Sequence, residues 1–277
     1  MPRFSVIVPA YNVAPHIRAC LEGLARQRVA PAEMEIVVVD NNSTDESAAI
    51  ARSFPGVRVL SEPVQSSYSA RNRGVRESTG EILAFLDPDC VPVPDWLASA
   101  EHGLRQEGTR VVLGRRSYGD SWPLSLVSDY EAEKVAWIME RRIPEIYYGY
   151  TNNMAMHRST FEQLGPFEVR PRGADTMLVR KVVDALGCDA VRYAPQMLVR
   201  HLEMNSLADY FDKRATYGGS NERIAREIRF RPLRNGERWE IYRRTRSANR
   251  SMINALVLLV LLALGAIVYD RARRRVG

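Results

Sequence analysis

The amino-acid sequence predicts an α/β domain built on a largely parallel sheet, followed by an apolar helix near the C-terminus. Short β-rich runs alternate with helical patterns through the first half of the chain, which is typical of a doubly wound α/β domain. The strand candidates are apolar without alternation, as expected for strands that are buried on both faces of a sheet. Residues Met252–Val268 are almost entirely aliphatic and carry no charge.

The predicted strands are short runs rich in apolar and β-branched residues. They are Phe4–Val8, Glu35–Asp40, Val57–Leu60, Ile82–Leu86, Val111–Leu113 and Asn153–His157. In an open parallel sheet, ligands bind beyond the carboxyl ends of the strands. The polar residues at those ends are therefore the first candidates for a functional site: Tyr11, Asn12, Asp40, Asn41, Asn42, Asp87 and Asp89.

The predicted helices place apolar residues three or four positions apart, so that each has one apolar face. One of them is opened by the capping box Ser43–Glu46 and runs toward Phe54. The others are Val13–Gln27, Ser69–Ser78, Trp96–Gln106, Leu124–Met139, Ser159–Leu164, Asp175–Leu186, Leu207–Tyr217 and Glu222–Phe230.

Composition and charge narrow the class of protein. Hydrophobic residues make up 45% of the chain, which is enough for a packed core and too many for a disordered protein. The formal net charge is +6, and much of the excess lies in arginines after Arg214. Arginines beside an apolar segment favour anionic lipid head groups. Because no nucleic-acid-binding motif accompanies them, we expect no nucleic-acid partner. Three widely spaced cysteines give no zinc or disulfide pattern, and we expect no signal peptide.

Four segments carry a resemblance to a known family. They are Val6–Asn12, Val37–Asp45, Ser69–Gly74 running on to Leu86–Asp89, and Asn152–Arg158 continuing through Gly165–Glu168. Together, in this order, they resemble the family-2 glycosyltransferases of the GT-A fold, over roughly residues 4–205. The resemblance implies a Rossmann-like nucleotide-binding α/β sandwich. It also implies transfer of a sugar from a nucleotide-sugar donor with inversion at the reacting carbon.

Asp87 and Asp89 are the predicted metal ligands. In the family the second acid binds the metal and the first lies toward the ribose or the metal. A divalent cation neutralises the charge that develops on the diphosphate leaving group. Mg²⁺ or Mn²⁺ suits a site of one or two carboxylates plus water. The alternative is a surface turn, because Asp-Pro-Asp is also good turn chemistry. Related enzymes often place a histidine near the metal or the diphosphate, which adds His201, with a structural role as its alternative.

The nucleotide side is predicted from the same resemblance. The acid that matches Asp40 accepts hydrogen bonds from the nucleoside, Tyr11 packs near the base, and Arg71 lies near the nucleotide. Helix capping is the alternative for Asp40, and a solvated helix face is the alternative for Arg71. The other predicted substrate-binding residues are Pro9, Asn12, Asn42, Asp87 and Asn153.

An inverting transferase needs a carboxylate that takes the proton of the acceptor hydroxyl. The family usually supplies this base from a Glu-Asp pair that opens a helix. Here Ala174 replaces the glutamate, and Asp175 is the predicted catalytic base. A helix N-cap is the alternative role for Asp175. Ala174 favours a second function, that of a catalytically inactive sugar-binding or scaffold module. A nucleotidyltransferase would need a Gly-rich phosphate loop after the first strand, which Pro9–Asn12 does not supply.

We expect the GT-A domain over residues 1–230, with a donor-binding half to about residue 115 and an acceptor half from about 116. Residues 231–251 are interpreted as an Arg-rich juxtamembrane linker, 252–269 as a transmembrane helix and 270–277 as a basic tail. The apolar run is close to the lower limit of about 17 residues for a span. A self-associating helix is the alternative. Because nucleotide sugars are cytosolic, we expect the catalytic domain on the cytoplasmic face of a bacterial membrane. There it would act on a lipid-linked or envelope glycan acceptor.

Overall fold

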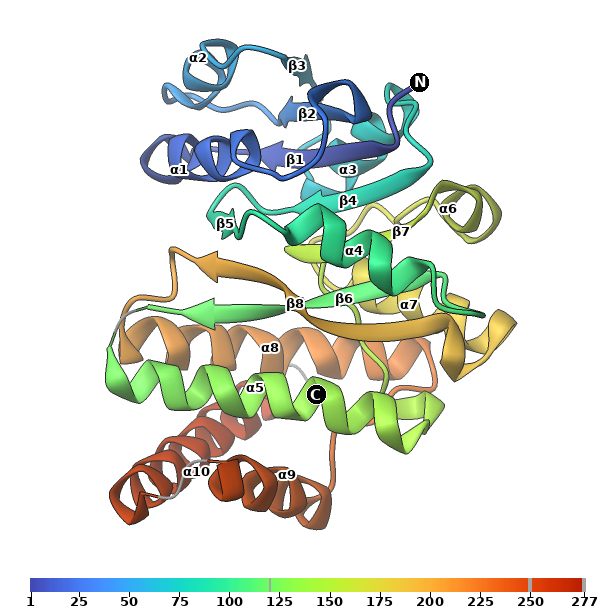
Figure 1. Cartoon of the computed structure of the whole chain (residues 1–277). Helices are drawn as coiled ribbons and strands as arrows, with labels where there is room; N and C mark the ends of the chain where they lie inside the picture. Colours follow the sequence, from blue (N-terminus) through green and yellow to red (C-terminus); the bar gives the residue numbers. More distant parts are fainter. Residues whose placement is uncertain (120, 249–250, 276–277) are drawn as a thin grey trace. The chain divides into compact units, whose positions relative to one another are not determined.

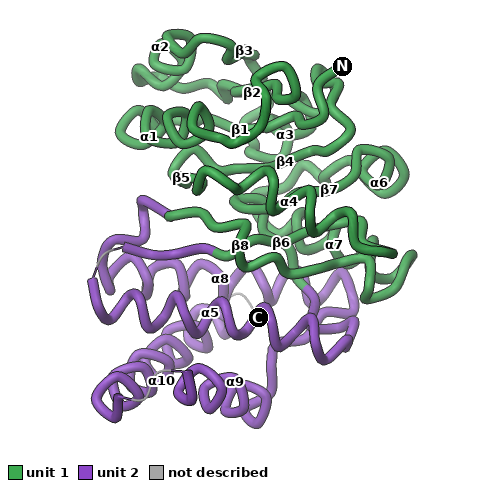
Figure 2. Tube along the Cα trace, in the orientation of Figure 1, with its two compact units in different colours: residues 1–115, 148–200 green, residues 116–147, 201–277 purple. Residues whose placement is uncertain are grey.

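The computed structural model describes residues 1–119, 121–248 and 251–275 (Figure 1). Residues 249–250 of the predicted linker and 276–277 of the predicted basic tail lie outside the described residues. The chain divides into two compact units, which are coloured separately in Figure 2. The first comprises Met1–Arg115 with Tyr148–Arg200, and the second comprises Arg116–Tyr147 with His201–Gly277. The expected division into donor and acceptor halves remains a prediction.

The first unit is built around a mixed sheet of eight strands in the order β3-β2-β1-β4-β7-β6-β8-β5. The strands are β1 (Phe4–Ala10), β2 (Met34–Asp40), β3 (Val57–Ser61), β4 (Ile82–Leu86), β5 (Cys90–Pro92), β6 (Val111–Tyr118), β7 (Asn153–His157) and β8 (Val191–His201). The six predicted strands all form. The short β5 and the long β8 were not predicted.

The sheet is parallel at one end and antiparallel in its middle. Strands β1, β2, β3 and β4 pair in parallel, and Ala10 of β1 stands opposite Asp40 of β2. The next strand, β7, runs antiparallel to both β4 and β6, with Asn153 opposite Leu86. The chain enters β7 at the edge where the parallel strands end, so β7 has to run back across the sheet. That edge gathers the carboxyl ends of β1, β2 and β4.

Helices cover both faces of this sheet. Even-numbered residues of β1, such as Val6 and Val8, are fully buried in one core cluster with Ile17 of α1. On the other face, a Cβ on Gly74 of α3 would lie 2.5 Å from Ile7, so helix and strand pack in close contact. The α-helices are α1 (Ala14–Ala25), α2 (Ser47–Arg52), α3 (Ser67–Arg76), α4 (Trp96–Leu104), α6 (Arg158–Leu164) and α7 (Ala174–Leu186), with 3-10 turns η1 (Pro31–Glu33) and η3 (Cys188–Ala190).

The predicted capping box of the second helix is wrong. Helix α2 begins at Ser47 and its N-cap makes no side-chain hydrogen bond. The Ser43 hydroxyl instead accepts from the Asn12 N–H at 3.2 Å, and the Asp45 carboxylate accepts from the Ala14 N–H at 3.0 Å. The polar residues expected to open the helix therefore tie the loop after β2 to the loop after β1.

The second unit is helical. Its helices are α5 (Trp122–Arg141), α8 (Leu207–Glu227), α9 (Asn235–Ala248) and α10 (Met252–Arg274), with the 3-10 turn η2 (Pro144–Ile146). Helix α8 is one helix where two were predicted. Gly218 lies inside this helix. A Cβ on Gly218 would lie 2.3 Å from the Tyr269 carbonyl oxygen, so the glycine permits close contact between α8 and α10. Helix α9 occupies most of the predicted linker. Helix α10 is long and apolar enough to cross a membrane, and is consistent with a membrane anchor.

Candidate active site

Two loops at the carboxyl edge of the sheet hold each other in place. Asn12 and Asn42 both have positive φ, at 50° and 67°, a conformation that asparagine tolerates better than most residues. The Asn12 side-chain oxygen accepts from the Thr44 N–H at 2.8 Å, and Asp40 Oδ1 accepts from the Ser43 N–H at 3.2 Å. These bonds fix the shape of the edge.

The predicted nucleotide residues at this edge differ in exposure. Pro9 is buried within β1, whereas the Tyr11 side chain is 51% exposed just beyond it. Asp40 is partly buried at the end of β2. An exposed tyrosine beside a partly buried carboxylate offers one surface for stacking and one hydrogen-bond acceptor. A nucleoside can use both.

Asn41 holds a third loop to the same edge, a role that the sequence did not predict. Its side chain is 2% exposed and donates to the Glu62 carbonyl at 2.7 Å, while its oxygen accepts from the Ser66 N–H at 2.9 Å. Asn42 donates to the Pro63 carbonyl at 2.9 Å. Together they fix the segment that leads into α3.

Helix α3 brings Arg71 to the first acid of Asp-Pro-Asp. Arg71 is 3% exposed, and its guanidinium forms an ion pair with the Asp87 carboxylate. The same guanidinium lies 5.5 Å from the centre of the Tyr68 ring. A solvated helix face, the alternative for Arg71, is therefore wrong. Only the arginine of this pair is buried, since the Asp87 side chain is 30% exposed. Removing one partner would leave the buried guanidinium without its counter-charge, so the pair holds Asp87 in position.

The same helix brings Tyr68 to the predicted base. The Tyr68 hydroxyl donates to Asp175 Oδ1 at 3.1 Å and accepts from the Gly173 N–H at 3.0 Å. Asp175 Oδ1 also accepts from the Thr176 N–H at 2.9 Å. Gly173, with φ of 92°, is the N-cap of α7, so the alternative reading of Asp175 as the N-cap is wrong.

The surroundings of Asp175 change its acidity. Burial raises the pKa of the Asp175 carboxyl above its ordinary value, while the Thr176 N–H, the charge of Arg71 and the Tyr68 hydroxyl partly offset that rise. A raised pKa makes a carboxylate a better proton acceptor, which suits a general base. Tyr68 was missed by the sequence analysis, although its position three residues before Arg71 puts both on one face of a helix.

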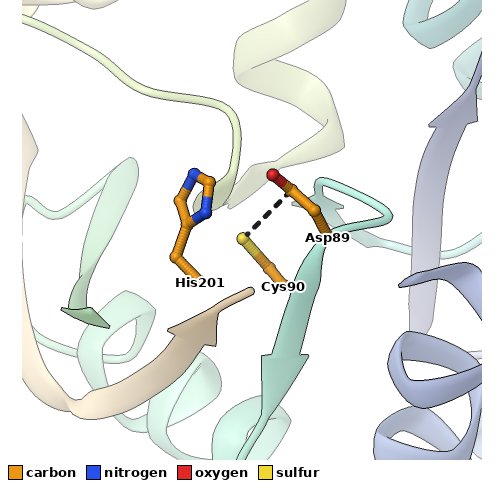
Figure 3. Close-up of side chains that lie close together, drawn as sticks. All are labelled: Asp89, Cys90 and His201. Atoms are coloured by element: carbon orange, nitrogen blue, oxygen red, sulfur yellow. Dashed lines mark hydrogen bonds between the residues drawn. The ribbon is translucent and has the colours of Figure 1, made fainter. Parts of the chain in front are cut away.

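The second acid of Asp-Pro-Asp lies in a different group. Asp89, Cys90 and His201 are all buried, and their candidate ligand atoms lie within 4.8 Å of one another (Figure 3). They come from neighbouring strands, because Cys90 begins β5 and His201 ends β8, directly after Arg200 of the first unit. The Cys90 thiol donates to Asp89 Oδ1 at 3.6 Å. Burial raises the pKa of the Cys90 thiol well above its ordinary value.

This donor set fits a divalent cation. The carboxylate of Asp89 and the imidazole of His201 are ligands that Mn²⁺ accepts, and the thiol of Cys90 is a softer donor. Asp87 is not in the group and instead pairs with Arg71. Of the three predicted ligands, the structure thus brings Asp89 and His201 together and adds Cys90, which the sequence analysis missed.

Asn153 lies inside the sheet. It is fully buried, and its amide donates to the carbonyl oxygens of Arg115 at 2.7 Å and Met197 at 2.8 Å. Its side-chain oxygen accepts from the Trp96 indole N–H at 2.8 Å. Both amide hydrogens are therefore engaged within the protein. In this geometry Asn153 ties β7 to β6 and β8, and a substrate contact by its side chain stays a prediction.

Comparisons with known proteins agree with this architecture. The chain is 28% identical over 221 residues to glycosyltransferase AglE of Haloferax volcanii, covering 74% of this chain and 72% of that protein. It is also 28% identical over 201 residues to validoxylamine A glucosyltransferase of Streptomyces hygroscopicus subsp. limoneus, covering 61% of this chain and 44% of that protein.

Two solved structures share the fold. Mannosyltransferase PcManGT from Pyrobaculum calidifontis, in complex with GDP-Man and Mn²⁺, matches with a TM-score of 0.65 and 23% identity, covering 99% of this chain and 83% of that chain. Glucosyl-3-phosphoglycerate synthase from Mycobacterium tuberculosis, in complex with Mn²⁺, UDP-glucose and glycerol 3-phosphate, matches with a TM-score of 0.61 and 21% identity, covering 83% and 82%. The model of glycosyl transferase family 2 matches residues 5–165, more than half of the chain, which therefore belongs to that family.

Proposed function

We propose that this transferase is an inverting, metal-dependent enzyme that moves a hexose from a UDP-sugar to a lipid-linked or envelope glycan acceptor. The observation that supports it best is the double role of helix α3. Its Arg71 holds Asp87 of Asp-Pro-Asp, and its Tyr68 holds the predicted base Asp175. One rigid element thereby sets the donor side and the acceptor side of the reaction together.

On the donor side, Tyr11 and Asp40 bind the nucleoside, with Pro9, Asn12 and Asn42 shaping the edge. Arg71 and Asp87 lie toward the ribose and the diphosphate. Asp89 and His201 hold Mg²⁺ or Mn²⁺, with Cys90 beside them. The cation supplies Lewis-acid neutralisation of the charge on the departing diphosphate. Mn²⁺ in complexes of two proteins of like fold supports this assignment.

On the acceptor side, Asp175 takes the proton of the attacking hydroxyl. The acceptor oxygen attacks the anomeric carbon from the face opposite the diphosphate, so a new carbon–oxygen bond forms as the bond to the diphosphate breaks. The bonding electrons leave with the diphosphate, and the proton ends on the Asp175 carboxylate. Its raised pKa, caused by burial, suits this transfer.

The acceptor and the location are inferred from the second unit. Helix α10 is apolar along most of its length, its last turn carries Arg271, Arg273 and Arg274, and Arg275 follows directly. An anchored enzyme meets acceptors that are themselves in a membrane. We therefore place the catalytic domain at the cytoplasmic face of a bacterial membrane, where nucleotide sugars are available.

A panel of nucleotide sugars tests this function. Purified full-length protein is incubated with Mn²⁺ and each donor, and release of the nucleoside diphosphate is measured. Turnover with one UDP-sugar supports the proposal. Turnover only with a sugar linked to a nucleotide other than UDP would show that the proposed donor nucleotide is wrong. Binding of donors without turnover of any of them would favour the inactive sugar-binding module. The replacement of glutamate by the buried Ala174 is the feature that raises that possibility.

A further inference from the structure

Helix α10 has two faces in different surroundings. One face is buried against its own unit, and its residues recur every three or four positions: Ala255, Leu258, Leu261, Gly265 and Tyr269. The other face is exposed, although it is equally apolar. This exposed stripe consists of Met252, Ile253, Leu256, Leu259, Val260, Leu264 and Ile267.

The buried face is fitted to helix α8. A Cβ on Gly265 would lie 2.7 Å from the Tyr210 hydroxyl, and a Cβ on Gly218 would lie 2.3 Å from the Tyr269 carbonyl oxygen. The Asn221 amide donates to the Tyr269 hydroxyl at 3.1 Å. Helices α8 and α10 thus each carry a glycine where the other helix approaches, and the hydrogen bond between Asn221 and Tyr269 also links them.

The first turn of α10 is held as well. The Trp122 indole N–H donates to the Asn254 side chain at 2.8 Å, and the Tyr242 hydroxyl donates to the Ala255 carbonyl at 3.0 Å. These bonds come from α5 and α9. Helix α10 is therefore attached to the folded unit along its length and is not a free segment beyond a linker.

The partner helix is too polar to enter a bilayer. Beside the last turn of α10, Glu222 of α8 forms an ion pair with Arg273 at 3.2 Å. Charged residues recur along α8, including Asp209, Asp212, Lys213, Arg223 and Arg226. Charges on a helix inside the hydrocarbon are costly unless they are paired or face water. While α10 is docked on α8, it can offer lipid only its exposed stripe.

The residues around the stripe fit the head-group region. Trp122 and Trp239 are 47% and 52% exposed, and tryptophan is enriched where a membrane meets water. Trp239 stacks on Tyr242 with ring centres 5.1 Å apart, which links it to α10. Arginines supply charge that is complementary to anionic lipid. The exposed ones among the described residues of α9 and the C-terminal end are Arg243, Arg246, Arg271, Arg273, Arg274 and Arg275.

We propose that the protein is monotopic: the exposed stripe of α10 inserts into one leaflet of an anionic bilayer, and both ends of the helix stay on the same side. An apolar helix face flanked by basic residues binds in the plane of the interface in this way. Basic residues around the stripe would repel those of a second copy, which disfavours a dimer as its occupant. The inference rests on the membrane part of the proposed function and specifies how the membrane is bound.

Labelling from one side of the membrane tests the arrangement. In a Cys188→Ser background, single cysteines are introduced as Glu107→Cys in the first unit and Arg275→Cys after α10. Inverted vesicles from bacteria expressing each full-length protein are treated with a membrane-impermeant maleimide. We expect both cysteines to be labelled without detergent. Protection of Arg275→Cys until detergent is added, with Glu107→Cys labelled throughout, would show that α10 spans, and would overturn the proposal while leaving membrane anchoring intact.

A paired set of variants tests the stripe itself. Leu256→Gln with Leu264→Gln alters two exposed residues of the stripe, and Val169→Gln with Leu186→Gln alters two exposed apolar residues elsewhere. In flotation with phosphatidylglycerol vesicles, we expect the stripe variant to lose binding by roughly tenfold or more and the matched control to stay within about twofold of wild type. Both should bind UDP normally, which shows that they fold.

Other outcomes of flotation contradict the inference in distinguishable ways. Unchanged flotation of the stripe variant would show that the exposed stripe does not contact the membrane. Failure of the wild-type protein to float would remove the membrane part of the proposed function together with this inference. A stable dimer without lipid that the stripe variant dissociates would assign the stripe to a second copy of the chain.

Discussion

Two carboxylates of the candidate site, Asp87 and Asp175, are held by one helix in different ways. Arg71 of α3 meets Asp87 with a full positive charge, whereas Tyr68, one turn earlier, meets Asp175 with a neutral hydroxyl. Burial then raises the pKa of Asp175. An ion pair holds a carboxylate in position, and a neutral hydrogen bond leaves a carboxylate able to accept a proton. This difference supports our proposal that Asp87 binds the donor and that Asp175 takes the proton of the acceptor.

The largest effect is expected from removing the reacting acid. Asp175→Asn should lower kcat by roughly 10²–10⁴-fold, the usual contribution of a general base. The affinity for UDP should change little, because the base acts on the acceptor proton. Steady-state kinetics and calorimetry with UDP measure the two quantities. If Asp175→Asn keeps near-wild-type turnover, the base lies elsewhere, and the proposed difference in role between Asp87 and Asp175 is wrong.

The next effect concerns the metal. In calorimetry, UDP should bind the wild type more tightly with Mn²⁺ than without it, and Asp89→Ala should remove that difference. Cys90→Ser serves as the matched variant in the same group and should keep most of it, because the softer thiol is the less suited ligand for Mn²⁺. Equal affinity for UDP with and without Mn²⁺ in the wild type would sink the metal site.

A smaller effect is expected when the ion-pair partner of Asp87 is removed. Arg71→Ala should raise KM for the donor by roughly tenfold or more, because it leaves a carboxylate without its buried partner. Arg71→Lys should recover part of the loss, since it restores the charge but not the fork geometry. A KM unchanged in both variants would show that the ion pair does not position Asp87 for the donor.

The smallest effect is a shift in pH dependence. The Tyr68 hydroxyl lowers the pKa of Asp175 against the rise caused by burial, so Tyr68→Phe should raise that pKa further. A base acts only when deprotonated. The acidic limb of the kcat profile should therefore move to higher pH, with the plateau at high pH largely kept. A limb that stays in place or moves to lower pH would contradict the proposed link between Tyr68 and Asp175.

The sequence predicted the parallel strands well, because runs such as Val37–Val39 have few other stable environments than a covered sheet. It did not predict β8, where Pro195 and two arginines interrupt the apolar pattern. Nor did it predict that Tyr68 meets Asp175, since 107 residues separate them along the chain. The parallel strands follow from local patterns, whereas partnerships across the fold do not.

The apolar helix shows the same limit. From the sequence, Met252–Val268 has no polar face, so no side of it is marked for burial in the protein. The side of α10 that packs on α8 is set by Gly218 and Gly265. Each glycine matters only because an atom of the facing helix lies where its Cβ would be. Both glycines lie inside their helices, and each marks a close contact between helices.

The sheet of the first unit is built from two stretches of chain, with α5 between them. Strands β1 to β4 lie within the first 86 residues and pair with one another, so they can associate early as the chain leaves the ribosome. Strands β7 and β8, together with α7, are made later, so they join the sheet after the first four strands. A nascent chain should thus gain the loops that we propose bind the nucleoside well before Asp175 and His201 arrive. On this proposal, incomplete chains would hold the nucleoside-binding edge without the base that sugar transfer needs.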